Sequence, residues 1–203
     1  MALITPRNIA TSKLTDGTAF LQSLPAGATV QTVQRNSQGT GQYASSSYSL
    51  TDFYCEITPL FANSKILITV NVNMGVNAGG NNHDVAMSFN FVDNQNPSGA
   101  TAIIAPNSTN GGSSTGASGA RMAAYGAAGC FANVAQIYNY WIAHPTIQYL
   151  YTPSYQNTNT RRITTVISTA FGYNVVENKC SINTTDPRDV RPRSVMTLQE
   201  IKA

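Results

Sequence analysis

The sequence is poor in charge. Only 10% of its 203 residues are Asp, Glu, Lys or Arg, whereas a typical soluble domain has roughly 25%. The net charge is +3, and the basic residues cluster only at Arg188, Arg191 and Arg193, where Asp186 and Asp189 are interspersed. Because nucleic-acid affinity grows with the number of phosphates that a protein neutralises, we expect no nucleic-acid partner.

Long hydrophobic runs are also missing. No segment approaches the roughly 20 apolar residues that cross a bilayer. Residues 1–14 have no basic segment followed by an apolar core, which is the pattern of a secretory signal. We therefore expect a chain that is synthesised in a cytoplasm and is not inserted into a membrane.

Residues that bind metals or perform catalysis are few and scattered. Cys55, Cys130 and Cys180 lie far apart without any Cys-x-x-Cys pair, so we expect buried free thiols and no zinc site. The two histidines, His83 and His144, occur without a Gly-x-Ser-x-Gly motif. A hydrolytic triad needs a nucleophile, a base and an acid held together, and the sequence offers no such set.

A glycosidase would need two carboxylates at a defined separation. Outside the Arg/Asp segment near the C-terminus, Asp52 and Glu56 are the closest pair of acids. In a strand they would share one face about 13 Å apart, which is too far for either glycosidase mechanism. We predict no enzymatic activity, no catalytic residue, no metal and no cofactor.

Alternating hydrophobic segments are what the sequence does contain, and the longest follows a turn at residues 57–64. Apolar and mostly polar residues alternate from residue 65 to residue 74. One face would consist of Ile66, Ile68, Val70, Val72 and Met74, and the other of Lys65, Leu67, Thr69, Asn71 and Asn73. A period of two is typical of a strand with one buried face, so this segment is predicted to be a central strand.

Similar short segments recur along the chain, with turn residues between them. Predicted strands lie at 28–35, 48–58, 85–92, 101–105, 161–172 and 194–201, and Pro145 and Pro153 divide residues 135–155 into two more. No segment is a convincing helix, and residues 122–134 could be a loop, a short helix or a strand. We predict one all-β domain at residues 28–203, an antiparallel β-sandwich that is jelly-roll-like in the sense that its first and last strands can be neighbours.

Three motifs, in their sequence and in their placement along the chain, resemble segments of surface proteins of tailed bacteriophages. They are the turn and strand start at 57–59 (ITP) and 63–68 (NSKILI), the opening strand at 30–34 (VQTVQ), and the closing strand at 194–201 (SVMTLQEI), which ends in an acid and an isoleucine. The resemblance implies a non-enzymatic structural protein displayed on the virion and made in the host cytoplasm. It leaves open a head decoration protein or a short tail fibre or spike, and it supplies no site residues.

A homotrimer is the expected oligomeric state. The resemblance implies it, because phage fibre and knob domains are usually trimeric. The low charge favours it independently, since a subunit contact can form with little charge desolvation. The Ala/Gly-rich residues 116–132 could line an axis, and the outward Leu67 and Val92 could be covered by a neighbouring subunit. A monomer with loops over those two positions is the alternative.

Residues 1–27 are predicted to be an N-terminal attachment arm. The segment shows no sustained alternation, and Asp16–Gly17 is a turn signal. Its apolar residues are spread out and include Ile4, Ile9, Leu14, Phe20 and Leu21. Such an arm either packs on its own domain or docks on a partner. The resemblance favours docking on capsid or tail proteins.

Aromatic residues gather between residues 138 and 151. Tyr138, Tyr140, Trp141, Tyr149 and Tyr151 could form a glycan-binding surface or a subunit interface. A carbohydrate-binding module that recognises a host surface glycan is therefore the alternative function. Burial in the sandwich core is the other explanation for these side chains, because aromatic residues bury large areas there.

Overall fold

The structure is a computed structural model, which describes residues 17–44, 48–77, 85–96, 99, 126–130, 142–169, 174–179 and 191–203. Strands make up most of these residues, and the strand pairs among them are antiparallel. The predicted all-β class is therefore confirmed. The predicted strand at 101–105 lies outside the described residues.

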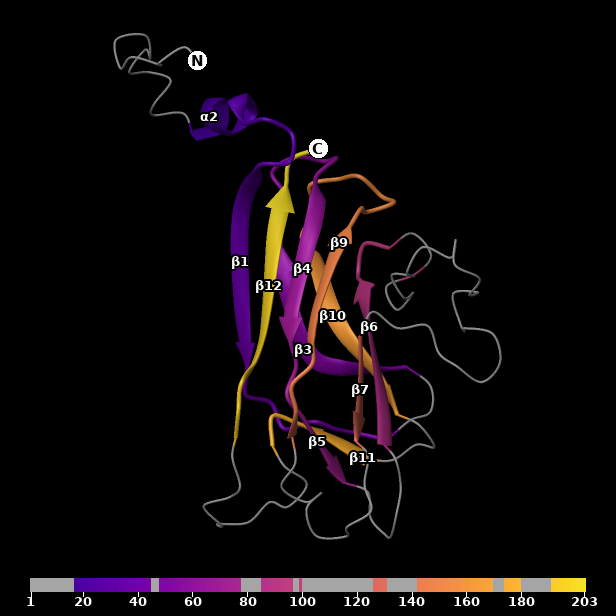
Figure 1. Ribbon diagram of the computed structural model, residues 1–203. Coiled ribbons are helices and arrows are strands. Elements are labelled where there is room, and N and C mark those ends of the chain that lie inside the picture. Colours follow the sequence, from indigo (N-terminus) through magenta and orange to yellow (C-terminus); the bar gives the residue numbers. More distant parts are fainter. Residues whose placement is uncertain are drawn as a thin grey trace.

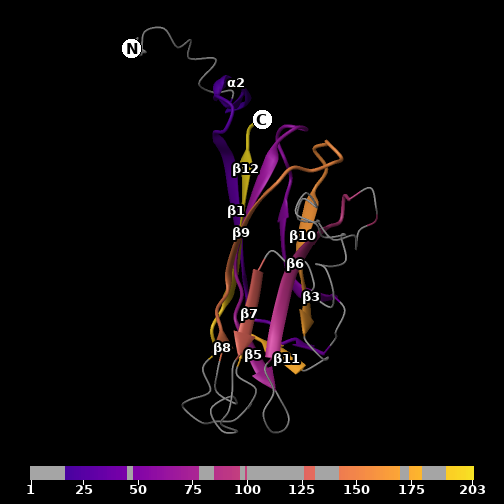
Figure 2. The ribbon, with the colours of Figure 1, turned by 45° about the vertical axis from the view of Figure 1, so that its right-hand side comes forward.

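Two four-stranded sheets face one another (Figures 1 and 2). The first sheet has the order β1 (Thr29–Ser37), β12 (Ser194–Ile201), β4 (Lys65–Asn71) and β9 (Thr146–Tyr151). The second sheet has the order β3 (Ser49–Ile57), β10 (Arg161–Thr169), β6 (Val85–Asp93) and β7 (Gly126–Cys130). A small end sheet has the order β2 (Gln42–Tyr43), β11 (Asn174–Glu177), β5 (Met74–Asn77) and β8 (Ile142–Ala143).

The three sheets share one strand order because two long ribbons run through all of them. In the outer ribbon, β1, β2 and β3 pair in turn with β12, β11 and β10. In the inner ribbon, β4, β5 and β6 pair with β9, β8 and β7. Both ribbons bend at the end sheet and cross from the first sheet to the second. This arrangement is a jelly roll, in which the first and last strands are neighbours, as the sequence analysis expects.

The core lies between the two sheets and follows the predicted alternation. All five apolar residues predicted to face inward between residues 66 and 74 have no exposed surface. Phe89 and Phe91 from β6 and Met196 and Leu198 from β12 are likewise fully buried. The predicted inward face is therefore confirmed, and β4 lies between β12 and β9. The strand itself ends at Asn71, and Asn73, which the alternation predicts to face outward, is buried.

The second sheet is buried on both faces along β10. Ile163 and Ile167 face the core, while Val166 between them is 2% exposed. On the neighbouring β6, Val92 is also only 2% exposed. Val92 is thus covered within a single chain and needs no neighbouring subunit, whereas Leu67 on β4 is only half-buried.

A short helix, α2 (Gly17–Ser23), precedes β1 and lies beyond the end of the two sheets, close to the C-terminus (Figures 1 and 2). This helix is not predicted from the sequence, because a helix of two turns is too short to show a clear period. Lys202 holds α2 in place. Its ammonium donates to the carbonyl oxygens of Gln22 and Leu24 at 2.6 and 2.7 Å, which the helix end leaves unpaired.

Candidate functional site

The predicted aromatic site is only partly described. Tyr138, Tyr140 and Trp141 lie outside the described residues. Tyr149 and Tyr151 both project from β9 toward the interior, where Tyr151 belongs to the core and Tyr149 packs against it. Tyr151 is 5% exposed, so its ring is not available to stack on a sugar. For these two residues the structure agrees with the packing explanation.

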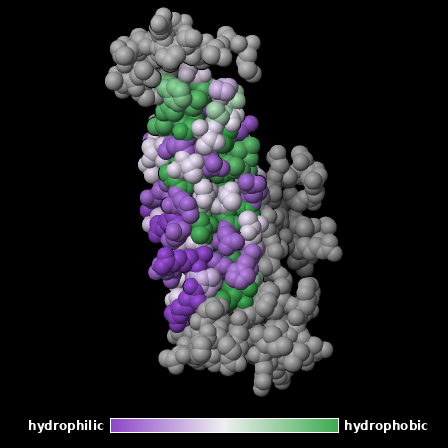
Figure 3. Space-filling model, turned by 60° about the vertical axis from the view of Figure 1, so that its left-hand side comes forward, coloured by the Kyte–Doolittle hydropathy of each residue, from purple (hydrophilic) through white to green (hydrophobic). Residues whose placement is uncertain are grey.

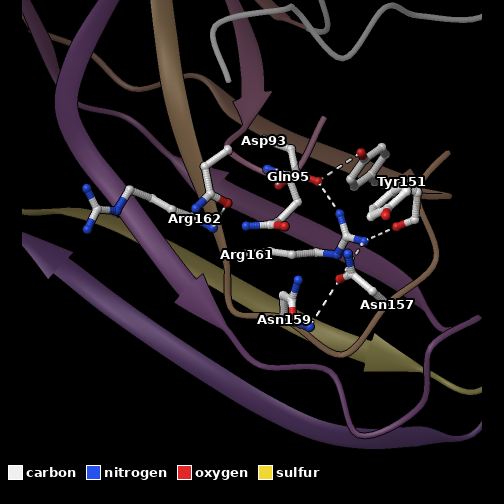
Figure 4. A network of polar contacts seen from close by, with 9 residues as sticks. Asp93, Gln95, Tyr151, Asn157, Asn159, Arg161 and Arg162 are labelled. Atoms are coloured by element: carbon white, nitrogen blue, oxygen red, sulfur yellow. Dashed lines mark hydrogen bonds and ion pairs between the residues drawn. The ribbon is translucent and has the colours of Figure 1, made fainter. Parts of the chain in front are cut away.

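Tyr151 belongs to a buried polar network at one end of the sandwich (Figure 4). Its hydroxyl donates to Asp93 Oδ2 at 3.0 Å, and one Arg161 guanidinium nitrogen donates to the same oxygen at 2.6 Å. The other Asp93 oxygen accepts the backbone N–H of Gln95 at 2.9 Å. Arg161 and Asp93 are 1% and 0% exposed, so this is a fully desolvated ion pair.

The Arg161 guanidinium also fixes the loop between β9 and β10. It donates to the backbone carbonyl of Tyr155 and, at 3.5 Å, to Asn157 Oδ1. Burial raises the pKa of the Tyr151 phenol, and the neighbouring Asp93 carboxylate raises it further. The phenol therefore stays protonated and acts as a donor. The network holds two strand ends and a loop together, and within it the buried Arg161 Nε and Asn157 Nδ2 have no hydrogen-bond partner.

Glu200 forms a second buried network at the same end. The backbone N–H groups of Leu60 and Phe61 each donate to Glu200 Oε1 at 2.9 Å, and the Ser64 hydroxyl donates to it at 2.6 Å. Gln31 donates to Oε2 at 2.6 Å. Glu200 has no exposed surface. The last strand therefore fixes the turn that precedes β4, and these are two of the three motifs on which the phage resemblance rests.

A third network lies at the opposite end, next to the end sheet. The Glu177 carboxylate accepts the hydroxyls of Ser37 and Tyr43 at 2.9 and 3.2 Å and the side-chain amide of Asn178 at 3.2 Å. Burial raises the pKa of Glu177, and the hydrogen bonds from Ser37 and Tyr43 offset part of that rise. Gly41 passes so close to the Tyr43 hydroxyl that a Cβ at this position would collide with it.

Asn178 extends this network to the last strand. Its φ angle of 53° lies in the left-handed region, which Asn adopts more readily than most residues. Its Oδ1 accepts the backbone N–H and the hydroxyl of Ser194 at 2.8 and 2.7 Å. The Ser194 hydroxyl in turn accepts the backbone N–H of Asn73 at 2.9 Å. The two ribbons are thus joined where they bend.

The histidines do not form a catalytic set in the part of the chain that is described. His83 lies outside it. His144 is exposed and its Nδ1 contacts Oδ1 of Asn73, an amide that cannot act as an acid or a base. Among the described residues, no group of three or more His, Cys, Asp or Glu side chains could hold a metal ion.

Asp52 and Glu56 both lie exposed on the outer face of β3. Glu56 forms an ion pair of 2.7 Å with Arg162, whose side chain is 49% exposed. The guanidinium groups of Arg35 and Arg162 lie 3.6 and 4.4 Å from the centre of the Tyr54 ring. These exposed side chains therefore contact one another across β1, β3 and β10.

Exposed apolar side chains gather at the end of the sandwich that carries α2. Phe20 in α2 is 63% exposed, Leu60 and Leu150 are 50% and 47% exposed, and Tyr155 is 56% exposed. In Figure 3, green side chains are concentrated at the upper end of the molecule, where α2 lies in Figure 1. Of the predicted arm residues, Phe20 is exposed and Leu21 is half-buried, whereas Ile4, Ile9 and Leu14 lie outside the described residues.

No helix in the described part of the chain is long and apolar enough to cross a membrane. A comparison of the chain with protein-family models and with curated proteins finds no match.

The three buried acids are not among the site residues predicted from the sequence, although a signal for two of them exists. Glu200 has the same strand parity as Met196 and Leu198, and Asp93 the same parity as Phe89 and Phe91. A charged residue at an inward position of a strand must find hydrogen-bond partners when it is buried. Inward parity could therefore have identified Glu200 and Asp93 as anchors, but it could not have identified their partners.

Proposed function

We propose that this chain is a structural protein of a tailed-bacteriophage virion, displayed on the particle surface and without enzymatic activity. It would be either a head decoration protein or a short tail fibre or spike. The observation that supports this most is the link between Glu200 and the turn at residues 58–64. It gives a physical reason why the motifs shared with phage surface proteins occur together.

The jelly roll itself is compatible with this role, since the fold occurs in viral capsid proteins and in lectins. Fold alone does not determine function. What supports a structural role further is the use of the buried charged groups. The Asp93 and Glu200 carboxylates each accept several hydrogen bonds from the chain itself, which suits a rigid scaffold rather than a reaction centre.

The end that carries α2 is the proposed attachment end. Phe20 and Leu60 expose apolar surface there, and the predicted arm leads into the domain at the same place. Clustered exposed apolar side chains are typical of a protein contact. We propose that residues 1–27 dock on a capsid or tail protein, and that the assembled form on the particle is a homotrimer.

Immunogold electron microscopy tests the proposed location. Antibodies raised against residues 28–203 should label the surface of intact particles that contain this protein. The proposal would be overturned if mass spectrometry detects no such protein in the particles. It would also be overturned if the antibodies label the particles only after they have been opened.

The second candidate is a carbohydrate-binding module for a host surface glycan. Jelly-roll lectins favour it, and so does the neutral surface rich in Asn, Gln and Thr. A glycan array with the purified chain separates the two candidates. Specific binding to one glycan class, abolished by that free sugar, would favour the receptor-recognition role.

A further inference from the structure

The two sheets differ in the charge of their outer faces. On the first sheet, the outward positions of the four strands together contain a single charged side chain, which is Lys65 at the start of β4. On the second sheet, β3 and β10 place Asp52, Glu56 and Arg162 on the outside. A scarcity of charge that is general in the sequence is therefore strongest on one face.

The outward side chains of the first sheet form three rows across β1, β12, β4 and β9. The register aligns Thr32, Gln199, Leu67 and Leu150 in one row, Gln34, Thr197, Thr69 and Gln148 in the next, and Asn36, Val195, Asn71 and Thr146 in the third. The first sheet is the nearer one in Figure 1. Leu150 is 47% exposed, so the chain does not cover this face by itself.

Several polar groups of these rows are already paired with one another. Gln148 donates to Thr69 Oγ1 at 3.4 Å, and Asn71 donates to Thr146 Oγ1 at 3.1 Å. Gln199 donates to Thr32 Oγ1 at 3.4 Å. A face whose neutral groups already bond to one another can be buried at a small desolvation cost, because few groups lose a partner when water leaves.

We propose that copies of this chain associate through the outer face of the first sheet, which in the proposed trimer faces the common axis. This inference deepens the trimeric part of the proposed function and names its surface. The face fits a second copy because Thr, Asn and Gln side chains both donate and accept hydrogen bonds. It is therefore complementary to itself, and no like charges oppose one another across the contact except at its Lys65 rim.

A sugar fits this face less well, because none of its outward side chains is aromatic. Tyr149 and Tyr151 in β9 project to the other side. Without a ring to stack on, a glycan would have only hydrogen bonds that already compete with water.

The size of the face limits how much of an interface it can supply. Four strands spaced about 4.8 Å apart and about seven residues long cover a projected area of about 450 Å². Three such faces amount to about 1,350 Å² of projected area, or about 450 Å² for each of the three pairwise contacts of a trimer, so a specific interface of roughly 1,000 Å² also needs contacts outside this face. The projected area is smaller than the accessible area, because side chains roughen the surface.

The test is a pair of isosteric substitutions that add one negative charge each. Gln148→Glu places the charge in the middle row of the face, and Gln156→Glu places it on an exposed loop outside the sheet. Light scattering on the full chain measures the mass, and circular dichroism checks the fold. We expect wild type and Gln156→Glu to have three times the mass of 21.7 kDa. Gln148→Glu should weaken association about tenfold or more, because each copy would bury an unpaired charge.

The outcomes separate the surface from the oligomeric state. A trimer that Gln148→Glu leaves intact overturns the proposed surface and leaves the trimer standing. A dimer that Gln148→Glu dissociates keeps the surface and overturns the trimer. A wild-type chain that is monomeric at 100 μM overturns both. If Gln148→Glu fails to fold, Gln34→Glu on β1 supplies the same charge in the same row at the other edge of the sheet.

Discussion

Three carboxylates, Glu200, Asp93 and Glu177, are fully buried, and each is stabilised in a different way. Asp93 has a guanidinium as its counterion. Glu200 has two backbone N–H groups, a hydroxyl and an amide. Glu177 has hydroxyls and an amide only, and burial raises its pKa. Their different partners predict different responses to substitution and to pH.

Glu200→Ala should lower the free energy of unfolding by about 3 kcal/mol or more. The substitution leaves the N–H groups of Leu60 and Phe61 without their acceptor, and hydrogen bonds to a charged group are worth about 1.5–3 kcal/mol each. Glu200→Gln should cost less, because one oxygen can still accept from this turn. Urea unfolding followed by circular dichroism measures both changes. Equal stability of wild type and Glu200→Ala would contradict the anchoring role.

Glu177 should make the protein less stable as the pH rises. Burial raises the carboxyl pKa above its ordinary value of 4.5, so the folded state binds the proton more tightly than the unfolded state. This contribution to stability is fully present below pH 4.5 and is lost as the pH rises through the folded-state pKa. The Ser37 and Tyr43 hydroxyls can rotate to accept a hydrogen bond, so Glu177→Gln can keep the network.

The measurement is the urea midpoint of wild type and of Glu177→Gln at several pH values from 4.5 upward. The difference between the two proteins should change in favour of the variant as the pH increases. A difference that is constant with pH would show that Glu177 does not titrate with a raised pKa.

At the scale of the element, β4 shows how completely a strand can separate its two faces. Ile68 has no exposed surface and lies between Leu198 of β12 and Tyr149 of β9. Asn71 is half-buried on the outer face, where its amide donates to Thr146. The same acidic substitution should therefore have opposite consequences at the two positions.

Ile68→Asp should abolish folding, because a carboxylate without a partner cannot be buried in the core. Asn71→Asp should fold, since it is isosteric and reaches water, although its charge on the outer face should weaken association of copies. Soluble yield and circular dichroism of the two variants test this. Comparable loss of soluble protein in both would contradict the assignment of faces.

The helix α2 is held at the end of the sandwich by contacts that include the Lys202 side chain. A helix of seven residues is too short to be stable by itself in water. Lys202 contacts its last carbonyls and also lies 5.4 Å from the centre of the Phe61 ring. The C-terminus and the turn before β4 together therefore set the direction in which the arm leaves the domain.

At the scale of the whole molecule, the arm and the sandwich should be separable. β1 begins at Thr29, and its pairs with β12 join residues 29–37 to residues 194–201. The arm adds to them the Gly27 N–H, which donates to the Lys202 carbonyl at 2.7 Å, and the carbonyls that the Lys202 ammonium contacts. A chain of residues 28–203 should therefore remain folded, with most of its unfolding free energy, but should no longer bind particles. Circular dichroism and co-sedimentation with particles measure the two properties. A truncated chain that still binds particles would contradict docking through the arm, and one that unfolds would favour an arm that packs on its own domain.

The sequence by itself determined the strands and their faces. Alternation at residues 66–74, 89–91 and 196–198 reports burial directly, because a side chain in a strand can point in only two directions. It also determined that β1 and β12 could be regular neighbours, and it indicated the turn before β4. These are local properties, and each can be read from a few consecutive residues.

Only the tertiary structure decided which distant residues meet. Glu200 and Ser64 are 136 residues apart, and Asp93 and Arg161 are 68 apart. Their contact depends on how the two ribbons bend and on the register between strands, which no local pattern records. The same is true of the neutral outer face of the first sheet. Its four strands come from both halves of the chain, so its lack of charge becomes a surface property only after β12 inserts between β1 and β4.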